Sequence, residues 1–253
     1  MQQVELENDY REAYDRVKCF KGIFTHDISN LFQIISNSIE LCGSLFGEHV
    51  NMEEIINYFD LIGQQVNRGK KLINNVRNLS LLEDYEMPLE SVDVYNTLKK
   101  AMKFTRVSFP RNKIDFTIVP DHGKLHVMAN ELLLDVFENL IMNSIIHNKN
   151  EIVKINVNIS KMEKYYENYI KIEFKDNGLG IEDSQKVKIF QGKQYQSTHS
   201  KGMGIGLSLV SKLIDLYKGK ISIEDRIKGD YTQGSNFVLL IPESKIIELY
   251  NKR

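Results

Sequence analysis

The chain has 253 residues, of which 42% are hydrophobic and 26% charged, and its formal net charge is −1. This composition is typical of a folded protein of one or two domains, and the balanced charge argues against nucleic acid as a direct partner. The two cysteines, Cys19 and Cys42, fall too far apart on one predicted helix to bridge, so a disulfide scaffold is excluded.

No apolar run approaches the roughly 18 residues that cross a bilayer, and the acidic N-terminus is unlike a secretory signal. We therefore expect a cytoplasmic protein, tethered to a membrane only if a further segment precedes the sequence given.

The first 85 or so residues contain no proline and show helical periodicity. One apolar stripe comprises Phe20, Phe24, Ile28, Leu31, Ile35 and Cys42, and a second comprises Ile55, Phe59, Ile62, Val66, Ile73 and Val76. Gly43, Gly47 and Asn51 supply turn chemistry between them, so the pattern predicts a helical hairpin. Because a lone hairpin leaves both stripes half exposed, we expect a homodimer in which two hairpins form a four-helix bundle.

Pro88 ends this pattern, and we expect one domain over residues 1–87 and another over residues 88–253. Alternating apolar residues predict strands over 114–118, 152–159, 169–174, 220–224 and 236–241. Helices are predicted over 131–146 and 207–217. Strands interleaved with a few helices indicate an α+β or α/β sandwich, which makes the chain a multidomain α and α+β protein.

Four segments of the second domain suit a nucleotide. Asn139 and Asn143 share one helical face, where two carboxamides can coordinate Mg²⁺ or polarise phosphate oxygens. An Asp-x-Gly-x-Gly motif follows a strand, three alternate glycines open a helix whose N–H groups can surround phosphates, and a Gly-Ser-Asn-Phe segment enters the last strand. Their residues are Asp176, Gly178 and Gly180, then Gly202, Gly204 and Gly206, then 234–237. Taken alone, two asparagines on a helix are more often solvated or capping, and the Asp-x-Gly-x-Gly segment is equally consistent with an ordinary turn.

The order of these segments resembles the Bergerat (GHKL) ATP-binding fold of histidine kinases, DNA gyrase, MutL-type repair ATPases and large heat-shock chaperones. The resemblance covers roughly residues 90–242 and implies an α/β sandwich that binds ATP and Mg²⁺. It implies that Asp176 accepts the adenine amino group, that Asn143 holds Mg²⁺, and that the glycine triplet flanks the triphosphate. It also implies an ATP lid over 191–201 that begins after Phe190. The nucleotide-contacting set expected on this basis is Asn139, Asn143, Asp176, Gly178, Gly180, Lys201, Gly202, Gly204, Gly206 and Leu207.

The residue one turn before the magnesium asparagine separates the kinases from the ATPases of this superfamily. ATPases place a glutamate there as the base for water, whereas this chain has Asn139. An amide cannot take a proton from water, so the γ-phosphoryl group is kept for another nucleophile. Glu138 is adjacent but lies about 100° away around the helix.

His26 is the predicted nucleophile. It falls about 200° from Phe24 around the first helix, facing away from the apolar stripe. Asp27 can hold one imidazole nitrogen as N–H and leave the other free to attack. With Asn30 one turn on, the segment resembles the phosphoacceptor box of dimerising histidine kinases. This implies autophosphorylation of His26, transfer to an aspartate of a response regulator in two-component signalling, and a role for Asn30 in orienting water for dephosphorylation.

Three positions depart from the kinase pattern. Ser29 and Ile146 stand where basic residues are common, and Leu31 stands where a proline is common. Lys149 or Lys201 can supply the charge missing at Ile146. Two alternatives remain: a gyrase- or MutL-like module in which ATP drives dimer closure, and a binding-only pseudokinase in which His26 is never phosphorylated.

Overall fold

The computed structural model describes residues 25, 28–45, 51–84, 87–120, 123–164, 166–190 and 205–244. The chain divides into two compact units, Met1–Val76 and Arg77–Arg253, so the division falls inside helix α2 (Met52–Asp84). The boundary expected between residues 87 and 88 stays a prediction. No helix in the described ranges is long and apolar enough to span a bilayer.

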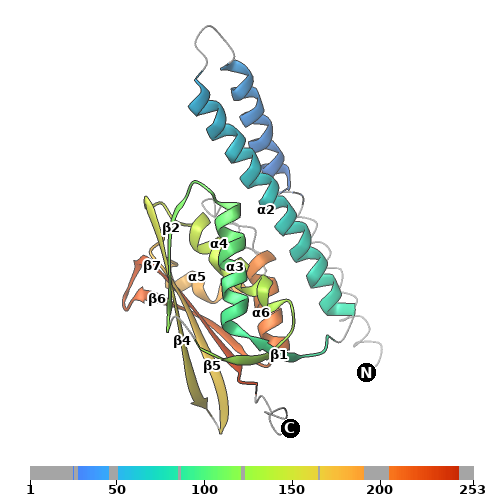
Figure 1. Ribbon diagram of the computed structural model, residues 1–253, viewed down its shortest axis with the longest axis vertical. Helices are drawn as coiled ribbons and strands as arrows, with labels where there is room; N and C mark the ends of the chain where they lie inside the picture. The colour runs from blue at the N-terminus through green and yellow to red at the C-terminus, as the bar shows by residue number, and fades with distance from the viewer. Residues whose placement is uncertain are drawn as a thin grey trace, which may run out of the picture. The chain divides into compact units, whose positions relative to one another are not determined.

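The described part of the first unit is helical. Residues 28–44 form one helix, and α2 follows beside it in the opposite direction (Figure 1). Asn51 Oδ1 accepts a hydrogen bond from Glu54 N at 3.3 Å, as an N-capping side chain does. The helices approach closely where Leu31 meets Gly69, since a Cβ built on Gly69 would lie 3.5 Å from Leu31 Cδ1. Both predicted helices are present, while their pairing with a second copy stays a prediction.

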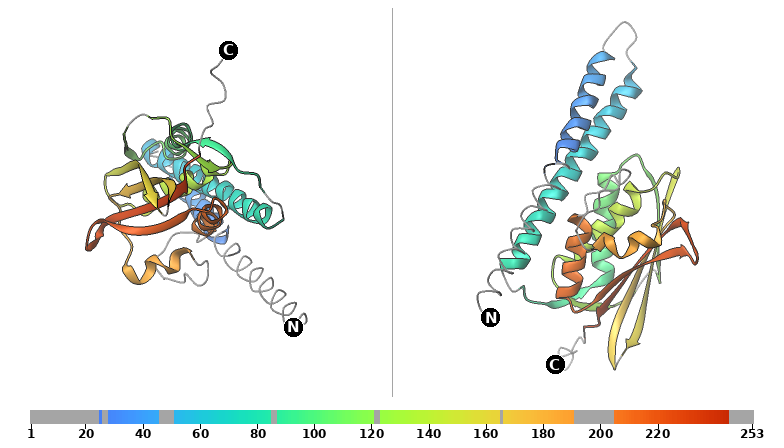
Figure 2. Two further views of the ribbon diagram at one scale, coloured as in Figure 1. Left: turned by 90° about the horizontal axis from the view of Figure 1, so that it is seen from below. Right: turned by 180° about the vertical axis from the view of Figure 1, so that it is seen from behind.

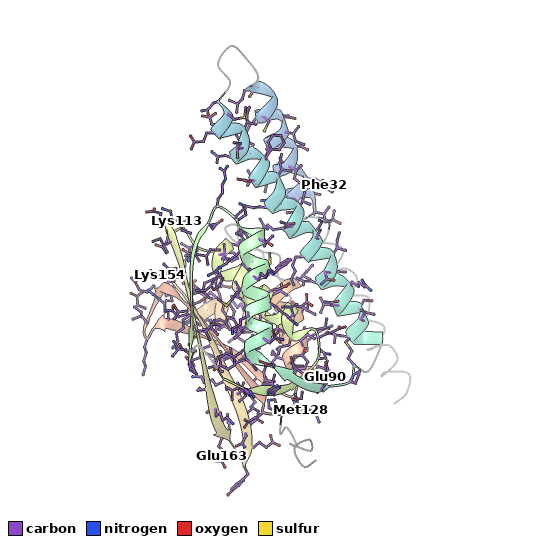
Figure 3. The ribbon with its side chains drawn as sticks, viewed as in Figure 1. Phe32, Glu90, Lys113, Met128, Lys154 and Glu163 are labelled. Atoms are coloured by element: carbon purple, nitrogen blue, oxygen red, sulfur yellow. The ribbon has the colours of Figure 1, made fainter. Side chains whose placement is uncertain are left out.

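The predicted apolar stripes divide between buried and exposed positions. Leu31, Cys42 and Ile55 are buried, whereas Phe59, Val66 and Ile73 on α2 are 61%, 41% and 56% exposed. These three follow one another at intervals of seven residues. Phe32 and Ile39, also seven apart, are 63% and 57% exposed, and Figure 3 shows Phe32 on the outside of its helix. An exposed apolar row with this period is typical of helices that pair with other helices.

The second unit contains a five-stranded mixed sheet. Its strand order is β2 (Lys113–Val119), β4 (Ile152–Lys164), β5 (Glu167–Asp176), β7 (Asp230–Pro242) and β6 (Lys220–Ile227). The pair β2 and β4 is parallel, and the other pairs are antiparallel. A separate small sheet pairs β1 (Glu90–Asp93) with β3 (His126–Ala129), where Figure 3 labels Glu90 and Met128. The five strands expected from the sequence are confirmed, and β1 and β3 are additional.

Three helices cover one face of the large sheet: α3 (Val94–Ser108), α4 (Leu133–Ile146) and α6 (Ile205–Leu216) (Figure 2). Two short turns of helix, α5 (Asp183–Lys186) and η1 (Lys188–Phe190), lie between β5 and α6 in the chain. Alternation along the central strands buries one set of side chains, which includes Ile155, Val157, Ile172 and Phe174, and leaves polar side chains on the other face. The rings of Phe137 on α4 and Phe174 on β5 lie 5.6 Å apart between centroids. The result is the two-layer α/β sandwich that the sequence predicts.

Helix α3 was not expected from the sequence. Asp93 begins it as an N-cap, with Oδ1 accepting from Asn96 N at 3.0 Å. Its buried face mixes apolar and polar side chains, among them Tyr95, Thr97 and Thr105. The hydroxyl of Thr105 donates to Ala101 O at 2.8 Å, which satisfies the hydroxyl within the helix. Because polar residues interrupt the apolar stripe on the buried side, the sequence of α3 does not show a recognisable helical period.

Candidate nucleotide-binding site

Asp176 is the last residue of β5 and is 3% exposed. Its Oδ1 accepts from Gly178 N at 2.8 Å and from Ser235 N at 3.3 Å, and its Oδ2 accepts from Ser235 Oγ at 2.6 Å. These donors come from the adjoining loop and from β7, and they fix the plane of the carboxylate.

One acceptor direction of Asp176 Oδ2 remains for a ligand. Ser144 Oγ lies 3.4 Å from Oδ2 but also 3.1 Å from Leu140 O, one turn earlier in α4. A hydroxyl has a single hydrogen, and the shorter contact to Leu140 O is the better hydrogen bond. A carboxylate has about four lone-pair sites, so Oδ2 can accept an additional donor such as an exocyclic amine.

The loop after Asp176 is held against the end of α4. Leu179 N donates to His147 O at 3.1 Å, and Asn148 Nδ2 donates to Asn177 Oδ1 at 2.8 Å. Asn177 also binds β4, accepting from Lys154 N at 2.8 Å and donating to Ile152 O at 3.0 Å. The Asn177 amide therefore fixes the loop from two sides.

Gly180 is confined by the neighbouring backbone. Its φ is +69°, and a Cβ placed on it would lie 1.5 Å from Tyr231 O. A side chain there would require β7 or the loop to move. This crowding explains the second glycine of the Asp-x-Gly-x-Gly motif.

The two asparagines occupy successive turns of α4. Asn139 is 6% exposed and its Nδ2 donates to Asp135 O at 2.8 Å, within the helix. Asn143 is half-buried and precedes Ser144, the residue that approaches Asp176. The C-terminal end of α4, which carries Asn143 and Ser144, therefore lies near the Asp176 carboxylate, and the role of Asn143 stays a prediction.

A buried hydrogen bond orients α6 relative to α4. Tyr217 follows α6, and its hydroxyl donates to Asn130 Oδ1 at 2.6 Å, just before α4 begins. Burial raises the pKa of Tyr217, so its hydroxyl stays protonated and can donate. This bond joins the end of α6 to the beginning of α4, and the two helices pack side by side, so they run antiparallel. The N-terminus of α6, with Gly206 and Leu207, therefore lies at the same end as Asn143.

Several predicted residues lie outside the described part of the chain. They are His26, Asp27, Lys201, Gly202 and Gly204, together with the expected lid over 191–201. Asn30 is described, exposed and helical, in the first unit. The structure thus brings Asp176, Gly178 and Gly180 together with the end of α4, and the assignments of site residues stay predictions.

Sequence reasoning missed the residues that hold the site together. Ser144 and Ser235 contact the carboxylate, and Asn148 and Asn177 fix the loop. The sequence offered one signal for them, namely that they lie in or beside the recognised motifs. Ser144 follows Asn143, Ser235 lies in the Gly-Ser-Asn-Phe segment, and Asn177 follows Asp176. Their roles depend on pairing between distant segments, which no local pattern reveals.

Comparison with known proteins gives a family match over this region. Residues 128–245 match the family of histidine kinase-, DNA gyrase B- and HSP90-like ATPases. The uncharacterized sensor-like histidine kinase ycf26 of Pyropia yezoensis is 29% identical over 224 residues, which are 78% of this chain and 34% of that protein. The autoinducer 2 sensor kinase/phosphatase LuxQ of Vibrio vulnificus is 24% identical over 247 residues, 93% of this chain and 28% of that protein.

Two solved structures show the same folds. The catalytic domain of histidine kinase ThkA is 25% identical, with a TM-score of 0.51 over 62% of this chain and 97% of that domain. Histidine kinase ThkA in complex with response regulator protein TrrA has a TM-score of 0.63 over 96% of this chain and 67% of that chain, at 21% identity.

The fold, the Asp176 site and these likenesses define an ATP-binding domain of the GHKL type. Over most of its length the chain is similar to sensor histidine kinases. It spans about a third of the length of the curated relatives it matches.

The crowding at Gly180 predicts a large difference between two glycine substitutions. Gly229 also has a positive φ, +82°, but a Cβ there would meet nothing within 4 Å. Gly229→Ala should therefore cost only the left-handed backbone term, about 1–2 kcal/mol. Gly180→Ala carries the same term plus a backbone collision, and we expect a loss of at least about 3 kcal/mol. Urea unfolding followed by circular dichroism measures both, and equal losses would show that the Gly180 loop relaxes freely.

Proposed function

We propose that the chain is the core of an ATP-dependent histidine kinase, which phosphorylates His26 and passes the phosphoryl group to an aspartate of a response regulator. The proposal rests mainly on the presence of an amide, Asn139, where the ATPases of this superfamily have a glutamate. Asn139 stands one turn before Asn143, and its amide nitrogen donates to Asp135 O within α4. No proton acceptor for water occupies that position, so the γ-phosphoryl group is preserved for transfer to a side chain.

The nucleotide would be held at both ends of the site. The adenine amino group donates to Asp176 Oδ2. This oxygen already accepts a short hydrogen bond from Ser235 Oγ, and its other neighbour, Ser144 Oγ, makes only a long contact. The phosphates lie toward the N-terminus of α6, at Gly206 and Leu207, where unpaired N–H groups favour anions. Lys201, Gly202 and Gly204 directly precede this helix in the sequence and complete the phosphate contacts.

Asn143 would hold Mg²⁺. In the described ranges no group of three or more His, Cys, Asp or Glu side chains is placed to bind a metal ion. Mg²⁺ is commonly bound by one or two protein oxygens plus phosphates and water. A single carboxamide oxygen at Asn143, together with the triphosphate, fits this pattern, and the ion supplies positive charge at the transferring group.

The acceptor chemistry belongs to the first unit. One imidazole nitrogen of His26 attacks the γ-phosphorus, the bond to the bridging oxygen breaks, and ADP leaves. Asp27 holds the proton on the other nitrogen, and the phosphoryl group then moves to a carboxylate of the response regulator. Asn30 orients a water that hydrolyses the phosphoaspartate of the regulator and releases inorganic phosphate. Because the donor is ATP, we place this reaction in the cytoplasm.

A second copy of the chain would cover the exposed apolar rows. Phe59, Val66 and Ile73 on α2, with Phe32 and Ile39 on the neighbouring helix, present apolar side chains at heptad intervals. Two such hairpins bury these rows against each other in a four-helix bundle. We therefore propose that the kinase core is a homodimer.

Replacing Asp176 should weaken ATP binding without unfolding the site. In Asp176→Asn the amide oxygen can still accept from Gly178 N and Ser235 N, while Ser235 Oγ can reverse and accept from the new amide. The acceptor for adenine is lost, a change of about 1.5–3 kcal/mol or roughly 10- to 150-fold in affinity. Calorimetry with Mg-ATP measures the effect, with exposed Asp215→Asn as the charge-matched control. Unchanged affinity in folded Asp176→Asn would remove Asp176 from the adenine site.

Labelling with γ-labelled ATP tests the kinase proposal itself. His26→Ala should abolish acid-labile label while ATP affinity stays unchanged, because the nucleotide site lies in the other unit. Asp27→Asn should lower labelling by about 10²-fold, the usual scale of general-base catalysis. Asn30→Ala should change labelling of His26 by only a few-fold but suppress dephosphorylation of the regulator. His49→Ala serves as the control for replacing a histidine. ATP binding without any label in the wild-type chain would instead establish a binding-only pseudokinase.

A charge placed in the apolar row should separate the two copies. Phe59→Glu sets a carboxylate at the centre of the proposed seam, where burying it costs several kcal/mol. Gln64→Glu adds the same charge on the same helix outside the row and is nearly isosteric. Sedimentation equilibrium should give a monomer for Phe59→Glu and a dimer for Gln64→Glu. Dimeric Phe59→Glu would show that this row is not the seam.

A further inference from the structure

A groove of about 500 Å³ lies between α3 and β2 in the second unit. It is separated from the Asp176 site by β4, because the sheet runs in the order β2, β4, β5. Its lining combines long cationic and apolar side chains: Lys99, Met102, Lys103, Arg106, Phe116 and Ile118. Nothing in the nucleotide chemistry uses these residues.

The groove is open because α3 packs on α4 rather than on β2. The buried face of α3 contains Val94, Leu98 and Ala101, and its closest helical neighbour is α4. Phe116 and Ile118 point to the helical side of the sheet but are only half-buried. They therefore form the apolar floor of the groove, and α3, which runs beside β2 in Figure 1, forms its other side.

The helix side of the groove is a row of cations. Lys99, Lys103 and Arg106 are spaced by four and three residues, so they share one face of α3, and all are exposed. Arg106 stacks over Phe116, with 5.5 Å between the guanidinium carbon and the ring centroid. Among the described residues no carboxylate pairs with any of the three. Local positive charge over an apolar floor calls for an anionic, amphipathic occupant.

The strand side of the groove is a free sheet edge. β2 is the first strand of the sheet and pairs only with β4 in the described ranges. Alternate N–H and C=O groups of β2 therefore point away from the sheet, which makes the edge a template for another strand. A strand added there would direct every second side chain toward α3. Lys113 marks the beginning of this edge in Figure 3.

We propose that the groove binds an extended, acidic segment of a partner protein, which adds a strand to the outer edge of β2. Its apolar side chains contact Met102, Phe116 and Ile118, and its carboxylates pair with Lys99, Lys103 and Arg106. Only an extended peptide uses the apolar floor, the row of cations and the free edge of β2 together, because the free backbone edge has no role in binding a lipid or a helix. The proposal does not depend on the kinase activity.

Fluorescence polarisation with the full chain tests the peptide. The probe is a short fluorescein-labelled peptide of alternating glutamate and valine, and the same peptide with lysine in place of glutamate is its control. Lys103→Glu should weaken probe binding about fivefold or more, since it replaces an attraction with a repulsion. Lys100→Glu, exposed on the same helix but outside the groove, should change binding less than twofold. Neither variant should alter affinity for Mg-ATP.

Hydrogen–deuterium exchange tests the strand addition. Bound probe should slow amide exchange in residues 113–119 and leave β6, the opposite edge strand, unchanged. Unchanged exchange in 113–119, or equal probe affinity for Lys103→Glu and Lys100→Glu, overturns the proposal. Binding of dodecanoate in place of the peptide would make the groove a lipid site. A fall in the sedimenting mass of probe-free Lys103→Glu would make it a contact between copies, and either result also overturns the proposal.

Discussion

The buried carboxylate of Asp176 is the constraint on which the nucleotide site depends. A carboxylate removed from water costs several kcal/mol unless hydrogen bonds replace its hydration. Asp176 obtains them from its own loop and from Ser235 on β7, with Ser144 of α4 beside it. These partners are far apart in sequence, so the acceptor geometry exists only after the sheet and α4 have assembled. Folding of the second unit and formation of the Asp176 site are therefore one event.

The antiparallel arrangement of α4 and α6 follows from a second buried hydrogen bond. Tyr217 and Asn130 join the end of α6 to the beginning of α4, at the opposite end of these helices from Asn143. Leaving either group unpaired in the core would cost about 1–3 kcal/mol. The bond thereby helps to fix which terminus of α6 lies near the end of α4, and it does so from outside the candidate site. Substitutions at the site can consequently alter ligand chemistry without releasing the helices that carry it.

The elements that could be predicted from the sequence are those whose pattern is local. Polar and apolar side chains alternate along β4 and β5, and α4 is apolar over most of its length. The spacing and the composition were therefore enough to predict these elements. β1 and β3 have four residues each, too few to show alternation, and the buried threonines of α3 blur its stripe. The same limit applies to the site: the Asp176 motif is contiguous, whereas Ser235 reaches it only through the pairing of β5 with β7. In the α2 stripe, Phe59, Val66 and Ile73 face solvent in the single chain, in line with the expectation that a lone hairpin leaves its stripes half exposed.

This exposure has a physical consequence, because a heptad-spaced apolar row is a surface that helices commonly bury by pairing. The described part of the first unit leaves such a row in solvent, whereas the second unit buries an apolar core between its sheet and its helices. The proposed pairing of two copies would therefore bury surface of the first unit, whereas the hydrogen bonds that the Asp176 carboxylate accepts come from the second unit. The groove beside β2 also belongs to the second unit, so its proposed occupant and the proposed helix pairing use residues of different units.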